Sequence, residues 1–159
     1  MFQACKRIGL LGFLGSLALV GCGGAADVQS DADPAQSLAE RAGAPLFEGM
    51  GDYHMPITTA DPDAQRYFDQ GMVLAFGFNH AESIRSFRAA QTLDPGCAMC
   101  FWGEALATGP NINVTSNGKA IMTPAERADA RAAIDQALAF TGGLTPKEQD
   151  WIRALDQRY

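Results

Sequence analysis

The chain has 159 residues, of which 47% are hydrophobic, a size and composition that suit one small domain. Its formal net charge is -6 and its sequence pI is about 4.7. No block or stripe of basic residues interrupts this acidic balance. Composition therefore argues against nucleic acid as a partner and against unaided electrostatic attachment to anionic lipid.

The first 21 residues have the organisation of a secretory signal peptide. Lys6 and Arg7 precede an apolar run, residues 8–20, that is too short to span a membrane as a helix. The run leads through Leu-Val-Gly to Cys22, a pattern that resembles a bacterial lipobox. The resemblance implies cleavage before Cys22 and attachment of lipid to its thiol and amine. The alternative is an ordinary secretory signal followed by an incidental cysteine.

The same resemblance implies a location. Gly23, rather than aspartate, follows the cysteine, which is typical of sorting to the outer membrane. We therefore expect a protein of the bacterial cell envelope, anchored by lipid in the outer membrane and facing the periplasm. At ~0.8 kcal/mol per buried CH2, three acyl chains would make the anchor effectively permanent. Loss of Lys6 and Arg7 with the signal peptide changes the formal side-chain charge from -6 to -8.

Residues 22–45 are expected to be a disordered tether, because Gly, Ala, Asp, Ser and Gln dominate and large apolar residues are almost absent. Such a tether typically reaches about 25–30 Å. Residues 46–61 form a lead-in segment, in which apolar and aromatic residues return at Leu46, Phe47 and residues 53–57.

Two helices joined by a tight turn are predicted next. Apolar residues recur at helical spacings after Pro62, at Tyr67, Phe68, Leu74, Ala75 and Phe78. Asp61 can cap this helix, and proline suits its first position. A turn at residues 77–80 precedes a second apolar stripe, formed by Ile84, Phe87, Ala90 and Leu93, and Asp94-Pro95-Gly96 ends that helix. A hairpin this small must stack on neighbours to bury its apolar face.

The order of small and large residues in this hairpin resembles the tetratricopeptide repeat, a helical-hairpin unit of about 34 residues. The signature positions are Tyr67, Gly71, Leu74, Ser83, Phe87, Ala90 and Pro95. Two of them depart from the family, in which alanine is usual at Ser83 and tyrosine at Leu74. Residues 53–59 and 109–113 also resemble a bacterial subgroup of these repeat proteins. The resemblance implies an all-α solenoid that binds extended peptides on its concave face.

A second repeat is predicted after Pro95. Its first helix has Phe101 and Trp102 at the large positions and Ala105 at the small one. An insertion at residues 109–123 then delays the partner helix, although most helical hairpins have much shorter loops. The partner helix starts at Pro124 and repeats the small-large-small spacing at Ala130, Ile134 and Ala137, with Leu138 following.

A fifth helix is predicted from Pro146 onward, which gives about two and a half repeats. Its apolar side is formed by Trp151, Ile152, Leu155 and Tyr159. Solenoids normally close with a polar cap, so we expect the chain to be the N-terminal part of a longer protein, with this side uncovered and available for self-association. The alternative is that the helix packs back on the core or on a second copy.

Cys97 and Cys100 form the sharpest chemical motif. In an oxidising compartment a C-x-x-C pair can form a local disulfide, and at a helix start it can also be redox-active. Buried reduced thiols and metal binding remain open as well, and His54 or His80 could complete a site for a soft metal. Covalent haem attachment is excluded, because Phe101 rather than histidine follows the second cysteine.

The remaining motifs favour binding over catalysis. No nucleophile elbow, phosphate loop or metalloprotease helix occurs in the sequence, so we expect no enzymatic activity and no cofactor. The insertion offers polar side chains for a partner, with Asn111, Asn113, Thr115, Asn117 and Lys119 as the candidates; the alternative is a merely flexible surface loop. The sequence thus predicts an envelope-anchored scaffold for a protein or peptide partner. A thiol-redox or soft-metal-handling lipoprotein using Cys97, Cys100 and a histidine is the alternative.

Overall fold

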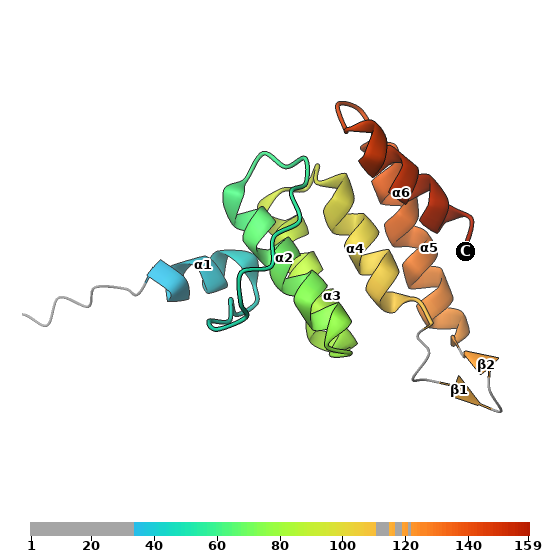
Figure 1. Ribbon diagram of the computed structural model, residues 1–159, viewed down its shortest axis with the longest axis horizontal. Coiled ribbons are helices and arrows are strands. Elements are labelled where there is room, and N and C mark those ends of the chain that lie inside the picture. The colour runs from blue at the N-terminus through green and yellow to red at the C-terminus, as the bar shows by residue number, and fades with distance from the viewer. Residues whose placement is uncertain (1–33, 111–114, 117–118, 121) are drawn as a thin grey trace, which may run out of the picture. The chain divides into compact units, whose positions relative to one another are not determined.

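A computed structural model describes residues 34–110, 115–116, 119–120 and 122–159 (Figure 1). Cys22 and the signal peptide lie outside the described residues, as do Asn111, Asn113 and Asn117 of the insertion. For Thr115 and Lys119 only the backbone is described. The described residues all belong to one compact unit of the chain.

Helices dominate this unit, as an all-α fold requires. They are α1 (Pro34–Ala42), α2 (Pro62–Phe76), α3 (His80–Leu93), α4 (Ala98–Thr108), α5 (Pro124–Ala139) and α6 (Pro146–Asp156). Two short strands, β1 (Thr115–Ser116) and β2 (Lys119–Ala120), pair antiparallel within the insertion. The five helices after the lead-in therefore lie where the sequence pattern predicted them, with the insertion between α4 and α5.

The first helix is a departure from the sequence prediction. Residues 34–42 belong to the segment expected to be a disordered tether, but they form α1, which contacts α3. Leu38 and Ala42 are one helical turn apart and both are buried, as is Ala44 beyond the helix. Two apolar side chains on one face are enough for docking here because α3 provides a complementary surface. The tether prediction is thus wrong for this part of the chain.

Local hydrogen bonds define the ends of the first hairpin. Asp61 caps α2 by accepting a hydrogen bond from the N–H of Asp63 at 2.8 Å, with Pro62 at the first helical position. Asn79 caps α3 and accepts from the N–H of Glu82. Between them Phe78 adopts a left-handed backbone conformation, with φ of 61°, so the chain reverses within three residues.

The helices of the hairpins approach closely because glycines face a phenylalanine. Phe87 of α3 is fully buried, and a Cβ built on Gly71 of α2 would lie 2.7–2.9 Å from its ring atoms. A Cβ on Gly103 of α4 would overlap the same ring. The hydroxyl of Ser83 donates a hydrogen bond to the carbonyl of Gly71 at 2.7 Å. The hydroxyl is therefore accommodated without an unsatisfied polar group.

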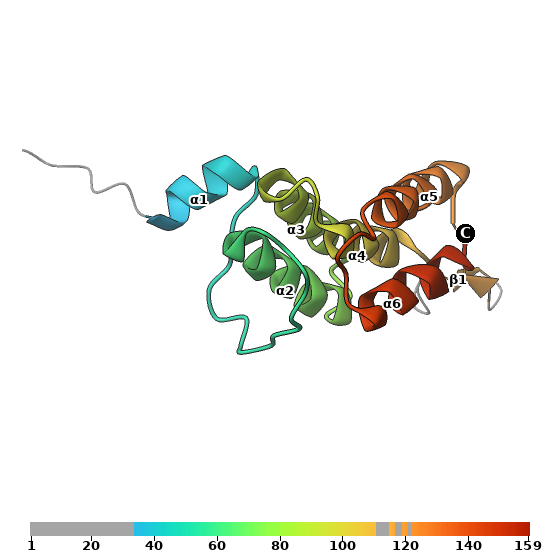
Figure 2. The same ribbon diagram turned by 90° about the horizontal axis from the view of Figure 1, so that it is seen from above.

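Consecutive helices reverse direction, so α2, α4 and α6 run the same way (Figure 1). Seen from above in Figure 2, α3 and α5 lie on one side of α4, and α2 and α6 lie on the other. Each helix from α2 onward contacts the next, and α4 also contacts α2 and α6. We call the surface formed by α2, α4 and α6 the α2/α4/α6 face.

The C-terminal helix is better covered than the sequence suggested. Ile152 is fully buried and Leu155 is buried, whereas Trp151 and Tyr159 are half-buried. The indole N–H of Trp102 donates to the carbonyl of Trp151 at 3.1 Å, and the Tyr159 hydroxyl donates to the carbonyl of Ala105 at 2.6 Å. The expectation of an uncovered apolar side is therefore wrong for Ile152 and Leu155, because α6 packs back on α4 and α5. Self-association through α6 stays a prediction.

None of the described helices is both long enough and apolar enough to cross a bilayer.

Candidate functional site

An extended segment, residues 46–60, runs alongside α2 of the α2/α4/α6 face (Figure 1) and makes contacts from Phe76 at the end of that helix back to its first turns; we call it the strap. Side chains of α2 bind its backbone. The N–H of Met55 donates to Asp69 Oδ1 at 3.0 Å, and the N–H of Ile57 donates to Gln65 Oε1 at 3.0 Å. Gln65 in turn donates from Nε2 to the carbonyl of Met55 at 2.9 Å. Two polar side chains one helical turn apart thus bind both polar groups of an extended backbone.

The start of the strap is fixed by two buried polar residues of α2. Gln70 accepts from the N–H of Phe47 at 2.6 Å and donates to the carbonyl of Pro45 at 3.0 Å. The hydroxyl of Tyr67 donates to the carbonyl of Ala44 at 2.6 Å. Burial raises the pKa of Tyr67, so this hydroxyl stays a donor over the physiological pH range.

The end of the strap is held by two carboxylates from other helices. Glu148 of α6 accepts from the N–H and the hydroxyl of Thr58, at 2.6 and 2.8 Å. Asp94, at the end of α3, accepts from the hydroxyl of Thr59 at 2.6 Å and from the N–H of Ala60 at 2.8 Å. Within the described residues α2 and α6 make no direct contact. The strap therefore connects α2 and α6 across the face, in addition to α4, which contacts both.

These hydrogen bonds affect the ionisation of both carboxylates. Burial raises the pKa of Glu148, but hydrogen bonds from Thr145 and Thr58 together outweigh it, and the net pKa lies below the ordinary value. Burial likewise raises the pKa of Asp94, while hydrogen bonds from Thr59, Ala60 and Gly96 give a net lowering. Both groups are therefore charged acceptors at neutral pH, which makes their hydrogen bonds to the strap stronger than neutral ones.

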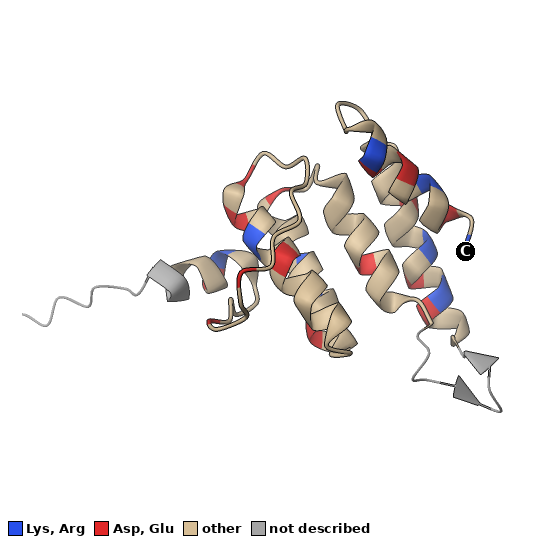
Figure 3. Ribbon diagram, viewed as in Figure 1, with Lys and Arg blue, Asp and Glu red and all other residues tan. Residues whose placement is uncertain are grey.

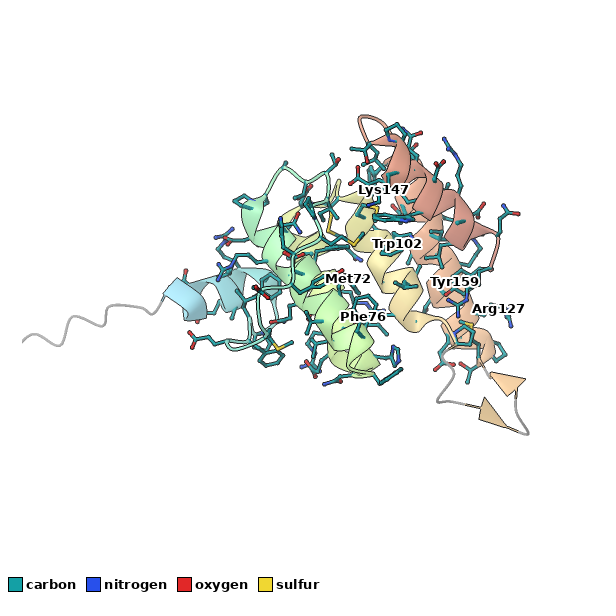
Figure 4. The ribbon with its side chains drawn as sticks, viewed as in Figure 1. Met72, Phe76, Trp102, Arg127, Lys147 and Tyr159 are labelled. Carbon is teal, nitrogen blue, oxygen red and sulfur yellow. A yellow bond between two sulfur atoms is a disulfide. The ribbon has the colours of Figure 1, made fainter. Side chains whose placement is uncertain are left out.

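The strap also contributes apolar contacts, at alternate residues. Met55 and Ile57 are half-buried against the core, whereas Pro56 and Thr58 are exposed. The core beneath includes Met72 of α2 and Trp102 of α4, both labelled in Figure 4. Alternation is the expected result when an extended segment lies on a surface, because successive side chains point in opposite directions.

The C-terminal half of the same face is only partly covered by the strap, which reaches it where the ring of Tyr53 packs edge-on against that of Phe76, with centroids 5.9 Å apart. A cavity of about 200 Å³ lies there. It is lined by Ala75 and Phe76 of α2, His80 of α3, Leu106 and Ala107 of α4, and Gly109, Pro110 and Arg158. Phe76 is 61% exposed, and both ring nitrogens of His80 are shielded from solvent without a hydrogen-bond partner. An apolar lining with a few polar groups is typical of a site that accepts a side chain of a ligand.

Charged residues of both signs are more frequent on α5 and α6 than on α4 (Figure 3). On α4, which forms the centre of the face, Glu104 is the one charged residue, and it pairs with Arg88 of α3 at 2.7 Å rather than with the strap. Lys147 of α6 lies over the ring of Trp151, 4.5 Å from its centroid, and Trp151 stacks on Trp102. The centre of this face is therefore nearly uncharged.

Cys97 and Cys100 are joined by a disulfide at the start of α4, with their Cα atoms 5.3 Å apart. Both residues are fully buried, in a cluster that includes Leu38 of α1 and Tyr67 of α2. Disulfide exchange requires a thiolate to reach one of the sulfur atoms, and here neither sulfur faces solvent. The geometry thus gives no support to the redox alternative.

The histidines do not approach the cysteines to form a metal site. His54 is exposed and pairs with Asp69 through Nδ1 at 2.8 Å. His80 lies at the open cavity. No group of three or more histidine, cysteine, aspartate or glutamate residues suited to a metal ion occurs among the described residues.

Sequence reasoning singled out few of the residues that form this site. It named the cysteines, the histidines and the repeat signature as candidates, but not Gln65, Asp69 or Glu148, and it gave Asp94 only as part of a helix end. The spacing of Gln65 and Asp69 is a recognisable pattern, because residues four apart lie one helical turn apart on the same face of a helix. Their partners are backbone groups of another segment, however, and no sequence pattern identifies such partners. The polar candidates of the insertion remain untested, since their side chains lie outside the described residues.

Comparison of the chain with protein-family models, with curated proteins and with solved structures found no match. The site is accordingly interpreted from its own geometry.

Proposed function

We propose that this chain is a tetratricopeptide-type binding scaffold of the bacterial cell envelope, anchored by lipid at Cys22 in the outer membrane and facing the periplasm. Its ligand is an extended segment of a partner protein, which lies on the α2/α4/α6 face. The scaffold catalyses no reaction in this proposal.

The repeat assignment is supported by spacing and packing together. Gly71 of α2 and Ala105 of α4 are 34 residues apart and are the small residues of successive first helices. The contacts of α2 with α3, of α3 with α4, and of α2 with α4 are those expected when one helical hairpin stacks on the next. Stacking of this kind leaves the first helices of the hairpins, α2, α4 and α6, on one shared face.

The observation that carries the binding proposal is the strap itself. The face already holds an extended chain, whose backbone N–H groups donate hydrogen bonds to Gln65, Asp69 and Glu148. Backbone recognition of this kind does not depend on the sequence of the bound segment. The open cavity beside Phe76 offers a place for an apolar side chain of a ligand on the same face.

Peptide display on the purified chain tests this function. Peptides selected for binding should lose about tenfold or more in affinity to a Phe76→Glu variant, because a charge would replace an apolar wall of the cavity. Phe140→Glu is the matched control: Phe140 is also exposed, but it lies at the end of α5, away from the face. Equal loss in both variants, or no selected peptide, would contradict the proposal.

A further inference from the structure

The strap is bound as a ligand would be, rather than as part of the helical framework. Its backbone makes hydrogen bonds with the side chains of Gln65, Asp69 and Glu148, which come from two separate helices. A different extended segment could accept and donate the same bonds, since every residue except proline offers one N–H and one C=O. The acceptors and donors of the face are thus independent of the sequence that now occupies it.

The side chains of the strap define what kind of segment fits. Met55 and Ile57, two residues apart, face the core, and Thr58 then places a hydroxyl on Glu148 at 2.8 Å. A segment with two apolar residues separated by one residue, followed by serine or threonine, would make the same contacts. A charged residue at either apolar position would be buried without a partner.

The strap is attached in a way that allows it to leave. A cavity of about 200 Å³ separates part of it from α2, lined by Phe47, Met50 and Tyr53 of the strap and by Asp69 and Val73, among others. Gly49 and Gly51 have φ of 73° and 82° with open space around them. Few buried apolar contacts and loose packing are features of segments that open locally.

Opening need not disturb the rest of the unit. Before the strap, Ala44 and Pro45 are held by Tyr67 and Gln70. After it, the side chain of Asp61 caps α2, although its backbone also bonds Thr59 of the strap. The strap is therefore a loop with two fixed ends. Its release removes the contacts of Leu46 and Ile57 with the cluster around α1, whereas Leu38 and Ala42 keep their place in that cluster with Tyr67.

From these contacts we infer that the surface beneath the strap is a recognition site for an extended segment of a partner protein, with the pattern apolar–any–apolar–hydroxyl. The strap occupies this site until the partner displaces it. This inference rests on the proposed function and adds the chemistry of the ligand and the regulation of the site.

A synthetic peptide of residues 51–61, labelled with a fluorophore, tests the inference directly. In the wild-type chain the strap competes at an effective concentration of about millimolar, because it is part of the same molecule. The chain variant Met55→Asp with Ile57→Asp should release the strap and bind the peptide about tenfold or more tightly than the wild type. Fluorescence anisotropy gives both affinities. Equal affinity of the two chains would overturn the inference.

Matched variants show whether the peptide binds at this site. Added to the strap-released chain, Asp69→Ala should weaken peptide binding about tenfold, because the peptide N–H loses its charged acceptor. Arg85→Ala, an exposed change on α3 that lies outside the cavity beneath the strap, should not. A peptide carrying the two aspartates should fail to bind. Unchanged binding after Asp69→Ala would place the peptide elsewhere and overturn the inference.

Hydrogen exchange on the wild-type chain provides a measurement that does not depend on any variant. The N–H groups of Met55, Ile57 and Thr58 should exchange through local opening, at least about tenfold faster than those in the centre of α2. If they exchange only when the whole unit unfolds, the strap is not displaceable and the inference is wrong. The proposed function would survive that result if the Phe76→Glu effect on selected peptides holds, since it concerns the C-terminal half of the face.

Discussion

At the scale of single residues, the closest contacts of the fold involve Phe87. Its ring lies 5.5 Å from that of Phe68, centroid to centroid, and faces Gly71 and Gly103 from two neighbouring helices. Glycine in a helix normally lowers stability by about 0.5–1 kcal/mol relative to alanine. Here the absence of a side chain is required, because any Cβ would enter space that the ring occupies.

Replacement of Gly71 by leucine should therefore destabilise the chain by about 1–3 kcal/mol or more, through overpacking against Phe87. Urea unfolding followed by circular dichroism measures the change. Gly142→Leu is the matched control, since no atom lies within 4 Å of a Cβ at that position. An unchanged midpoint for Gly71→Leu would mean that α2 and α3 do not approach as described.

The disulfide leads to a second prediction at this scale. Cys97 and Cys100 close a very short loop, so little chain entropy is removed from the unfolded state. Replacing both by serine should therefore lower the free energy of unfolding by no more than about 2 kcal/mol through the loss of this entropic effect.

The native pair should be chemically quiet, since both residues are buried. The tryptic peptide of residues 89–119, prepared without reductant, should have the mass of the oxidised form. Recovery of two free thiols from that peptide would contradict the disulfide and revive the redox and metal alternatives.

At the scale of elements, sequence reasoning found the helices that carry strong periodic patterns and clear ends. Pro62, Pro124 and Pro146 each follow a capping residue, and each begins a helix in the structure. It missed α1, in which only Leu38 and Ala42 mark an apolar face and polar composition suggested disorder. Such a helix depends on docking to α3, a tertiary contact that local composition does not contain.

The strap shows the same limit at the candidate site. Residues 46–61 could be recognised as a lead-in because apolar residues return there. That Thr58 reaches Glu148, 90 positions along the chain, could not be predicted, because it depends on how α6 packs against α4. The Thr145–Glu148 spacing is typical of a capping box, which is indeed present. It gives no sign that the same carboxylate also holds another segment.

The strap should loosen in acid. Both Glu148 and Asp94 have a folded-state pKa below the ordinary value. Their contribution to stability is therefore fully present above the ordinary carboxyl pKa, at about 4, and is lost as the pH falls through the lower folded-state pKa. The urea concentration at the unfolding midpoint, measured from pH 7 down to pH 2, should therefore decrease as the pH drops below about 4.

Two variants assign this pH dependence. Glu148→Gln should lower the midpoint at pH 7 and flatten part of the acidic decline, because the titrating group is gone. Asp150→Asn, a change at a carboxylate that is 74% exposed on the same helix, should leave the profile nearly unchanged. A Glu148→Gln profile parallel to that of the wild type would contradict the role of this carboxylate.

At the scale of the whole molecule, the prediction concerns the membrane anchor. If Cys22 carries the lipid, Cys22→Ala should leave an uncleaved or soluble chain, because processing and acylation both require the cysteine. Partition between detergent and aqueous phases, with the mass of the N-terminal peptide, distinguishes these forms. A variant that loses its signal peptide and still partitions fully into detergent would show that the lipobox interpretation is wrong.

The position of the strap in the chain has a mechanical consequence for a protein anchored at its N-terminus. A partner bound to the scaffold and drawn away from the membrane would put the chain under tension, and that tension would enter the folded unit at α1. It would reach α1, then the strap, before any hairpin of the array, because the chain passes through them in that order. The strap is held mainly by side-chain hydrogen bonds, and α1 by a few apolar contacts and the ion pairs of Arg41 with Asp61 and Asp63, so they would yield first. Force on the anchor and displacement by a ligand would then act on the same segment.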